Sequence, residues 1–246
     1  MQIKTDSSAL YTKNHLSQQW LLWLSALLAL YVTLPWLAPI FMKLGWAQGG
    51  EWIYSLYRFF CHQLPQRSFF LFGTKTMYSL EEIQNVWQNS NNPLILRQFT
   101  GNAAMGWKVA WSDRMVWMYS SPLLFGLLYA RRRQSPKPIA WWLFALLLLP
   151  MAVDGGTHLI SDLIAGIDQN FGQGFRDHNR WLAQLTNYRY SATFYAGDAL
   201  GSFNFIMRML TGLLFGLGVV TFIYPHLEML LSDNGRSSAK HPSFPQ

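Results

Sequence analysis

The sequence IAWWLFALLLLPMAVDGGTHLISDLIA, residues 139–165, is long and apolar enough to cross a bilayer as one helix. Three of its polar residues, Asp154, His158 and Asp162, stand four positions apart, so a helix places them on one face. Polar groups are costly in lipid, and we therefore expect this stripe to face other helices or a wet cavity. These three residues are the candidate catalytic residues, as acid–base groups or as ligands of a hard metal ion.

Three further apolar segments accompany this one. The chain is 51% hydrophobic, yet its mean hydropathy is only +0.09, because apolar and polar residues are strongly segregated. The segments predicted to span the membrane are 20–42, 115–130, 139–165 and 203–231. The second is the shortest, but arginines flank it at 114 and 131, as is typical of a span. This pattern predicts an all-α integral membrane protein with about four transmembrane helices in one membrane domain, residues 20–231.

Positive charge is distributed unevenly along the chain. The 131–138 loop and the tails 1–19 and 232–246 hold 8 Lys and Arg residues in 42 positions, whereas the 43–113 and 165–202 loops hold 9 in 109. Because the denser set is expected on the inner side, both termini are predicted to be cytoplasmic and both large loops extracytoplasmic, in the cell membrane. The C-terminal tail is expected to be flexible.

The chain is basic, with a pI of about 9.6, but this excess of positive charge fits membrane topology. Its basic residues form no patch interleaved with stacking aromatics, which argues against nucleic acid as a partner. The lipid bilayer is the partner that the sequence indicates, and protein partners in the membrane stay open.

Short interfacial helices are expected in both large loops. Residues 52–60 carry apolar side chains at helical spacing and predict a helix that lies at the membrane interface. Ser79 with Glu82 is a capping box, which predicts a helix from Leu80 to Trp87. In the second loop we expect another short helix from Arg180 to Leu185.

A candidate binding site lies near the outer ends of the predicted spans. Asp154 and Arg208 fall at nearly one depth, so we expect them to form an ion pair. Cys61 is the only cysteine, which excludes an intrachain disulfide and a cysteine-based zinc cage. Arginines beside a polar pocket suit a phosphate or a carboxylate. The candidate binding residues are Cys61, His62, Gln63, Arg67, Arg114 and Arg208, and the sequence leaves open whether a cofactor or a metal is bound.

Four ordered blocks of residues carry a resemblance to a known family. They are Phe60, Cys61, His62 and Gln63 with Arg67, Ser68 and Phe69; Arg114 with Tyr119; Pro150, Asp154, Gly155 and Thr157; and Arg208, Thr211 and Gly212. With these blocks the chain resembles the domain-of-unknown-function 2085 family of bacterial and archaeal membrane proteins. The resemblance implies a small polytopic membrane protein and implies no activity.

The chain departs from that family at two places. Members usually carry a Cys-x-Arg-Cys element where this chain has residues 112–115, Ser-Asp-Arg-Met, and a Gln commonly stands where this chain has His158. The missing thiols argue against a cysteine-based mechanism here.

Each candidate residue also has a plain structural explanation. The pair of Asp154 with Arg208 fits an interhelical link that fixes the packing of a helix bundle. His158 fits a hydrogen bond to a neighbouring loop, and Cys61 fits a small buried apolar residue. Three classes of function therefore remain: an enzyme that acts on a lipid-linked or anionic substrate, a transporter or proton-relay component, and a structural or assembly subunit of a membrane complex.

Overall fold

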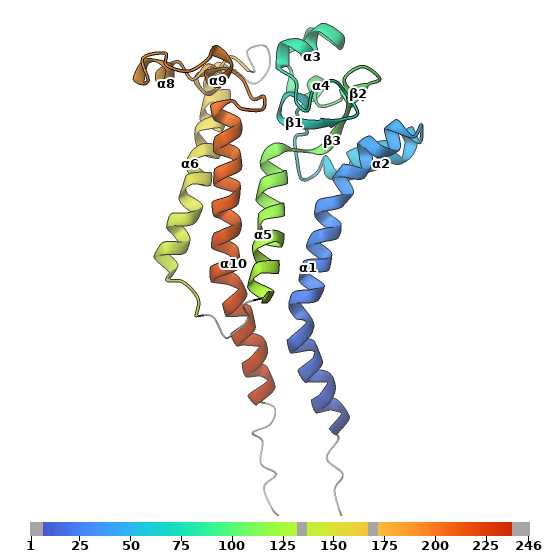
Figure 1. The fold of residues 1–246 in the computed structure, drawn as a ribbon, viewed down its shortest axis with the longest axis vertical. Helices are drawn as coiled ribbons and strands as arrows, with labels where there is room; N and C mark the ends of the chain where they lie inside the picture. The colour runs from blue at the N-terminus through green and yellow to red at the C-terminus, as the bar shows by residue number, and fades with distance from the viewer. Residues whose placement is uncertain (1–6, 132–136, 167–171, 238–246) are drawn as a thin grey trace, which may run out of the picture.

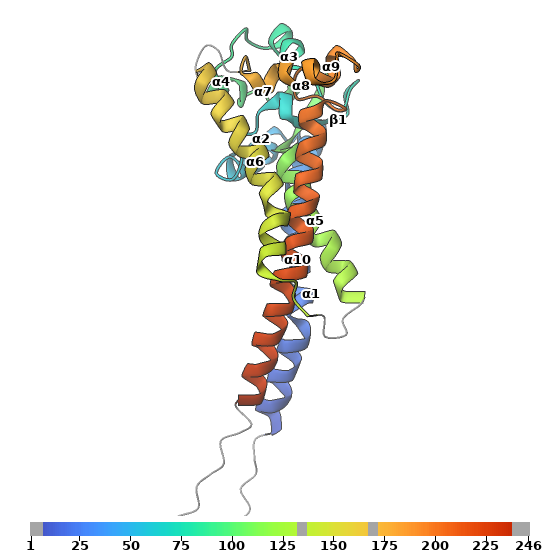
Figure 2. The same cartoon turned by 90° about the vertical axis from the view of Figure 1, so that its left-hand side faces the viewer.

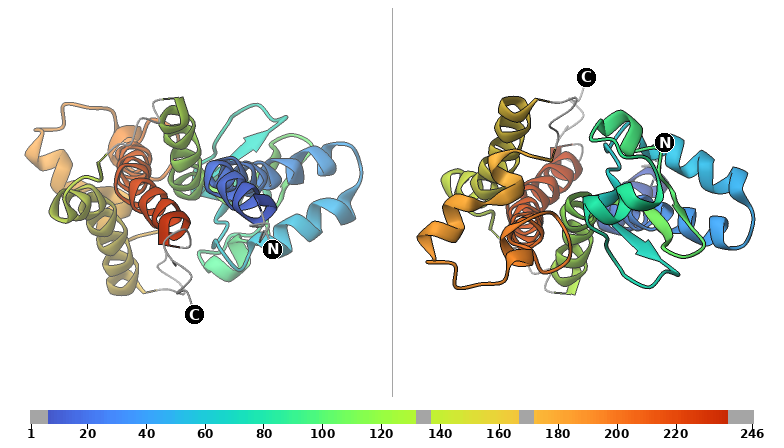
Figure 3. Two further views of the ribbon diagram at one scale, coloured as in Figure 1. Left: turned by 90° about the horizontal axis from the view of Figure 1, so that it is seen from below. Right: turned by 90° about the horizontal axis from the view of Figure 1, so that it is seen from above.

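A computed structural model describes residues 7–131, 137–166 and 172–237. The protein is mostly helical, at 67%. Four long helices form its bundle: α1 (Ser7–Lys43), α5 (Asp113–Arg131), α6 (Trp141–Ala165) and α10 (Phe203–Ser237). Seen along the bundle in Figure 3, α5 and α10 lie in the middle, with α1 on one side and α6 on the other. The start of α1 and the end of α10 lie at one end of the bundle, and the short elements gather at the other (Figures 1 and 2).

Within the described ranges, three helices are long and apolar enough to cross a membrane: Gln19–Lys43, Trp141–Ala165 and Phe203–Leu231. They agree with three of the four segments predicted from the sequence. The remaining one, 115–130, also forms a helix, α5, which at 19 residues is long enough but is not apolar enough to be among the three. The number of spans is therefore three by length and composition, and a fourth stays a prediction. Helix α1 begins at Ser7 and α10 ends at Ser237, beyond the expected bounds; residues 1–6 and 238–246 lie outside the described ranges.

Glycines bring α5 and α10 close together. A Cβ at Gly212 would stand 2.7 Å from Cβ of Trp117, and one at Gly216 would stand 2.1 Å from Oγ of Ser121. Any larger residue at either position would push the two helices apart. Ser121 Oγ also donates a hydrogen bond to the Gly212 carbonyl at 2.8 Å. This packing fixes the start of α5 against the first turns of α10, where the charged residues described below lie.

The two segments 44–112 and 172–202 form what we call the head region, at the end of the bundle away from the start of α1 (Figure 1). The first segment holds α2 (Ala47–Tyr57), a 3₁₀ turn η1 (Pro65–Arg67), β1 (Ser68–Leu71), α3 (Leu80–Val86), α4 (Pro93–Leu96), β2 (Gly101–Asn102) and β3 (Gly106–Ser112). The second holds α7 (Phe175–His178), α8 (Arg180–Leu185) and α9 (Ala192–Tyr195).

A small antiparallel sheet in the head region corrects the expectation of an all-α fold. Its strand order is β1-β3-β2, with Phe70 opposite Lys108 and Gly101 opposite Trp107. Strand β3 is the central strand of the sheet and α1 packs against it, so it is buried along most of its length and its sequence GWKVAWS lacks the apolar–polar alternation of a half-exposed strand. Gly106 closes the β2–β3 hairpin at a φ of +76°, a conformation that favours glycine.

The short helices of the head region agree closely with the sequence. Ser79 Oγ accepts from the Glu82 N–H at 3.2 Å while Glu82 accepts from the Ser79 N–H at 2.8 Å, which confirms the capping box. Helix α8 has the bounds that were predicted. Helix α2 covers 47–57 where 52–60 was expected, and it leaves Trp52 and Leu56 exposed.

Candidate functional site

Four arginines and four aspartates form ion pairs where the head region meets the bundle, and we call them the ion-pair network. In its first group, Arg208 on α10 donates from Nε to Asp113 Oδ2 at 2.8 Å and from Nη1 to Asp198 Oδ1 at 2.6 Å. Asp198 also accepts from Arg67 Nε at 2.7 Å. Arg67 Nη2 lies 3.6 Å from Asp177 Oδ1. This group ties the 3₁₀ turn η1 to α5, α7 and α10.

The two aspartates of the network that lie between α6 and α10, Asp177 and Asp198, have pKa values shifted in opposite directions. Burial raises the pKa of Asp198, but Arg67 and Arg208 lower it further than burial raises it, so this carboxyl stays ionised well below its usual range. Burial, and next the charge of Asp198, raise the pKa of Asp177 to about 6. The pKa values of Asp177 and Asp198 differ because Asp198 pairs closely with two arginines, whereas Asp177 lies 3.6 Å from one.

The second group of the network centres on Asp154 of α6. Its Oδ2 accepts from Arg114 Nη2 at 2.7 Å, and its Oδ1 accepts from Arg176 Nη2 at 2.6 Å. Asp154 and Arg176 are buried, and the Arg114 side chain is about one-fifth exposed, at 19%. Two cations therefore share one carboxylate, which leaves the group of Arg114, Asp154 and Arg176 with an excess positive charge.

The predicted pair of Asp154 with Arg208 is wrong. Both residues join the network, but Asp154 pairs with Arg114 and Arg176, whereas Arg208 pairs with Asp113 and Asp198. Equal depth places two residues at one level of a bundle without specifying which faces they occupy. The position of Asp113, at the start of α5 beside α10, determines which carboxylate Arg208 meets.

The polar stripe of α6 faces α7 and the ion-pair network. Asp154 and His158 are buried, and Asp162 is partly buried. His158 Nε2 lies 3.4 Å from Arg176 Nη2, while its Nδ1 has no hydrogen-bond partner among the described residues. No group of three or more His, Cys, Asp and Glu side chains suited to a metal ion occurs in the described part of the chain. The three candidate catalytic residues thus share a face but do not form a metal-binding cluster there.

The six candidate binding residues line one small cavity of about 120 Å³. Cys61 is buried in its wall as a free thiol, and its Sγ accepts from the backbone N–H groups of Gln63 at 3.3 Å and Ser112 at 3.4 Å. The Oγ of Ser112 lies 3.4 Å from Cys61 Sγ. The cavity residues predicted from the sequence are Cys61, His62, Gln63, Arg67, Arg114 and Arg208, and the structure adds Leu64, Ser112, Asp113 and Met115.

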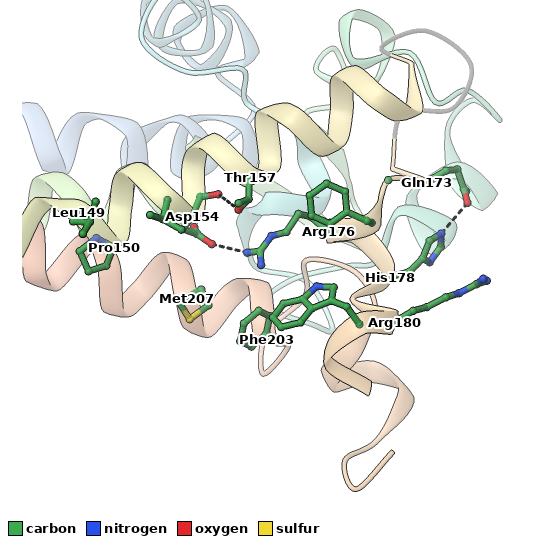
Figure 4. Close-up of a pocket in the computed structure, with 14 residues that line it drawn as sticks. Leu149, Pro150, Asp154, Thr157, Gln173, Arg176, His178, Arg180, Phe203 and Met207 are labelled. Atoms are coloured by element: carbon green, nitrogen blue, oxygen red, sulfur yellow. Dashed lines mark hydrogen bonds and ion pairs between the residues drawn. The ribbon is translucent and has the colours of Figure 1, made fainter. Parts of the chain in front are cut away.

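A larger pocket of about 940 Å³ lies on the other side of Asp154, between α6 and α10 and beside α7 and α8 (Figure 4). We call it the apolar pocket. Its wall is mostly apolar, and Asp154, Arg176, His178 and Arg180 supply its charged and ionisable groups. The Arg176 guanidinium also lies over the Phe203 ring, 5.4 Å from its centre. The apolar residues of the wall are Leu149, Pro150, Val153, Phe175, Trp181, Phe203 and Met207.

Four residues of the network were not singled out from the sequence: Asp113, Arg176, Asp177 and Asp198. Asp113 directly precedes the candidate Arg114, so it could have been included among the candidates on the basis of its position. Arg176 and Asp177 lie in a loop without helical or strand periodicity, and no sequence spacing relates them to Asp154.

The fold and its buried charges define a helical membrane protein with three candidate spans. The model of the family described as "Predicted membrane protein (DUF2085)" matches residues 103–222, which confirms the resemblance found in the sequence. The matched range holds every residue of the ion-pair network except Arg67. The chain is also similar to the uncharacterized protein MJ1492 of the archaeon Methanocaldococcus jannaschii, with 27% identity over 165 residues, which cover 64% of this chain and 81% of that protein. No solved structure matches the chain.

Proposed function

We propose that this membrane protein binds an anionic amphiphile, such as a lipid with a phosphate headgroup, in the apolar pocket. The observation that carries the proposal is the combination of a 940 Å³ apolar pocket with cationic residues at one end. Pockets of this size bury most of a small ligand, and the few polar groups in the wall fix its orientation.

The acyl chain lies along the part of the wall that α6 and α10 supply. Leu149 and Pro150 of α6 face Met207 and Phe203 of α10 across the pocket (Figure 4). Val153 of α6 also lines it. Burying these surfaces against an acyl chain is favourable in proportion to the apolar area removed from water.

The anionic group lies at the end formed by Arg176, His178 and Arg180. Arg176 and Arg114 already share Asp154, so the excess positive charge of that group is offset only through the neighbouring carboxylates Asp177 and Asp198, with which Arg176 forms no ion pair within 4 Å. The Nε of Arg176 is buried without a hydrogen-bond partner among the described residues. An arginine with donors to spare is suited to a phosphate or carboxylate, which it binds through two parallel hydrogen bonds.

Asp154 acts in this proposal as a positioning residue. Both of its carboxylate oxygens accept hydrogen bonds from arginines, which leaves it poorly suited to accept a proton from a substrate. It holds Arg114 and Arg176 in place, and Arg114 connects it to the small cavity that Cys61 and Arg208 also line. The proposal retains α5 as a fourth span and the head region outside the cytoplasm, in line with the distribution of Lys and Arg.

The proposal is tested by measuring the affinity of the purified chain for phosphatidic acid and for the diacylglycerol with the same acyl chains. Phosphatidic acid should bind more tightly, and Arg180→Ala should weaken its binding about tenfold, because a charge-assisted hydrogen bond is worth about 1.5–3 kcal/mol. Arg189→Ala is the matched control, since Arg189 is exposed in the same loop and lines neither pocket nor cavity. Equal affinity for the two lipids would contradict the proposal.

A further inference from the structure

A second hollow of about 490 Å³ lies on the far side of α7 from the apolar pocket, and we call it the polar groove. It is formed by α3, the loop after it, and the segment from α7 to α9. Its lining residues are Gln66, Ser79, Leu80, Glu81, Gln84, Asn91, Gly172, Gln173, Asp177, His178, Ala192, Thr193, Ala196, Gly197 and Asp198.

The polar groove and the apolar pocket adjoin each other. Gln173 and His178 line both, and they meet in a hydrogen bond of 3.1 Å between His178 Nε2 and Gln173 Oε1 (Figure 4). Along α7, Arg176 belongs to the apolar pocket and Asp177 to the polar groove. If an anionic group binds at Arg176 and His178, a substituent attached to it would therefore extend into the polar groove.

The groove is lined mainly by uncharged hydrogen-bonding groups. Gln84, Asn91 and Thr193 bring amide and hydroxyl groups to the wall, and such groups both donate and accept hydrogen bonds. Gln84 Nε2 already donates to Asn91 Oδ1 at 2.6 Å and to the Ser90 carbonyl at 3.2 Å, so its Oε1 is the atom that it presents as an acceptor. Gln66 is buried in the wall, and its Oε1 has no hydrogen-bond partner among the described residues. Such a surface matches a neutral substituent with several hydroxyl groups and offers no wall for a second acyl chain.

The carboxylates of the groove do not make it a strong cation site. Asp198 pairs with Arg67 at 2.7 Å and with Arg208 at 2.6 Å, and Asp177 lies 3.6 Å from Arg67. Their charges are thus offset within the ion-pair network. Glu81 adds a carboxylate at the exposed side of the groove, and this charge disfavours a second phosphate.

We infer that the ligand is a lipid whose phosphate carries a neutral polyhydroxyl head, such as a sugar or a cyclitol, with the head in the polar groove. The inference rests on the proposed function, because it places the phosphate at Arg176 and His178 and the acyl chain in the apolar pocket. It adds the class of headgroup.

The test compares three lipids with identical acyl chains on the purified full chain: phosphatidylinositol, phosphatidic acid and phosphatidylethanolamine. Phosphatidylinositol should bind about tenfold more tightly than phosphatidic acid, which corresponds to one or two added hydrogen bonds. An equal or smaller affinity for phosphatidylinositol overturns the inference, and so does an advantage for phosphatidylethanolamine in its place. If phosphatidic acid binds no better than diacylglycerol, the proposed function itself fails, so the two failures are distinguishable.

Two variants locate the effect in the groove. Ala192→Trp fills the groove from an exposed position, and Gln84→Ala removes one of its amides; each should abolish most of the advantage of phosphatidylinositol and leave the affinity for phosphatidic acid unchanged. Gln88→Ala is the control for the second, because Gln88 is exposed after α3 and does not line the groove. An advantage that survives both groove variants places the polyhydroxyl head elsewhere and overturns the inference.

Discussion

Arg176 donates a hydrogen bond from Nη2 to Oδ1 of Asp154 at 2.6 Å, although the first residue lies on the short helix α7 and the second in the middle of α6. Both side chains are buried. The pair fixes α7 to the face of α6, and it places a guanidinium in the wall of the apolar pocket.

Asp154 and Arg176 should be strongly coupled, whereas Asp154 and Arg208 should not be. Asp154→Asn leaves the buried Arg176 and the partly exposed Arg114 without their carboxylate, and the loss of one partner of a buried pair costs about 3–5 kcal/mol of unfolding free energy. The double variant Asp154→Asn with Arg176→Gln should be less destabilised than the sum of its single variants by about 1 kcal/mol or more. Combining Asp154→Asn with Arg208→Gln should be additive, because these residues have different partners.

Reversible unfolding in detergent measures both cycles. Coupling in the second cycle and additivity in the first would support the pairing that we expected from depth along the helices and would contradict the pairing in the structure.

The wrong pairing of Asp154 with Arg208 shows which parts of the site can be predicted from the sequence and which cannot. The four-residue spacing of Asp154, His158 and Asp162 was enough to place them on one face, because the geometry of a helix depends only on the local chain. The residues around the small cavity were found through ordered motifs. The partner of Asp154 was not found, because Arg176 lies on the short helix α7, whose position beside α6 depends on packing in the head region.

For the fold, too, some elements were predicted from the sequence and others were missed. Long apolar runs predicted three helices that qualify as spans, and the capping box at Ser79 predicted the start of α3. The sheet was missed because β1 has four residues and β2 only two, and because β3 is covered on both faces. Short strands of this kind lack the alternation from which strands are predicted.

His158→Gln should leave the protein folded and its lipid affinity nearly unchanged. The glutamine side chain retains a hydrogen-bonding group within reach of Arg176, so the change in unfolding free energy should stay within about 1 kcal/mol. Thermal melting and phosphatidic acid binding at pH 6 and pH 8 check this. A folded variant that loses lipid binding, or its dependence on pH, would instead make His158 part of the working site.

Asp177 should make the protein less stable as the pH rises from about 4 to about 6. Its pKa in the folded protein is raised to about 6 by burial and then by Asp198, above the ordinary value of 3.8. The folded state therefore holds this proton more tightly, so the contribution is present at low pH and is lost as the pH rises through the folded pKa. Over the whole window the loss is about 3 kcal/mol for this one group.

Asp177→Asn should remove that part of the pH dependence, because the asparagine does not ionise while its amide oxygen can still accept from the Gly174 N–H. Melting profiles of wild type and variant at pH 4, 5, 6 and 7 provide the measurement. The variant should gain stability relative to wild type as the pH rises. Parallel profiles would mean that Asp177 does not titrate in this window.

The orientation in the membrane follows from positive charge and is checked by cysteine labelling. In a Cys61→Ser background, a cysteine at Asn89 in the head region should react with an impermeant thiol reagent in intact cells, and one at Lys137 should not. Both residues are exposed, so access to the reagent depends on the side of the membrane. Labelling at 137 alone would place the head region in the cytoplasm.

The most direct test of the proposed lipid site is photocrosslinking in detergent with a phosphatidic acid that carries a photoreactive group in its acyl chain. Adducts should form on peptides that contain Val153 and Met207, on the two sides of the apolar pocket. Excess unlabelled phosphatidic acid should suppress these adducts, and the matching diacylglycerol should not. Adducts confined to the exposed face of α1, around Trp23 and Leu27, or equal suppression by both lipids, would contradict a specific anionic-lipid site between α6 and α10.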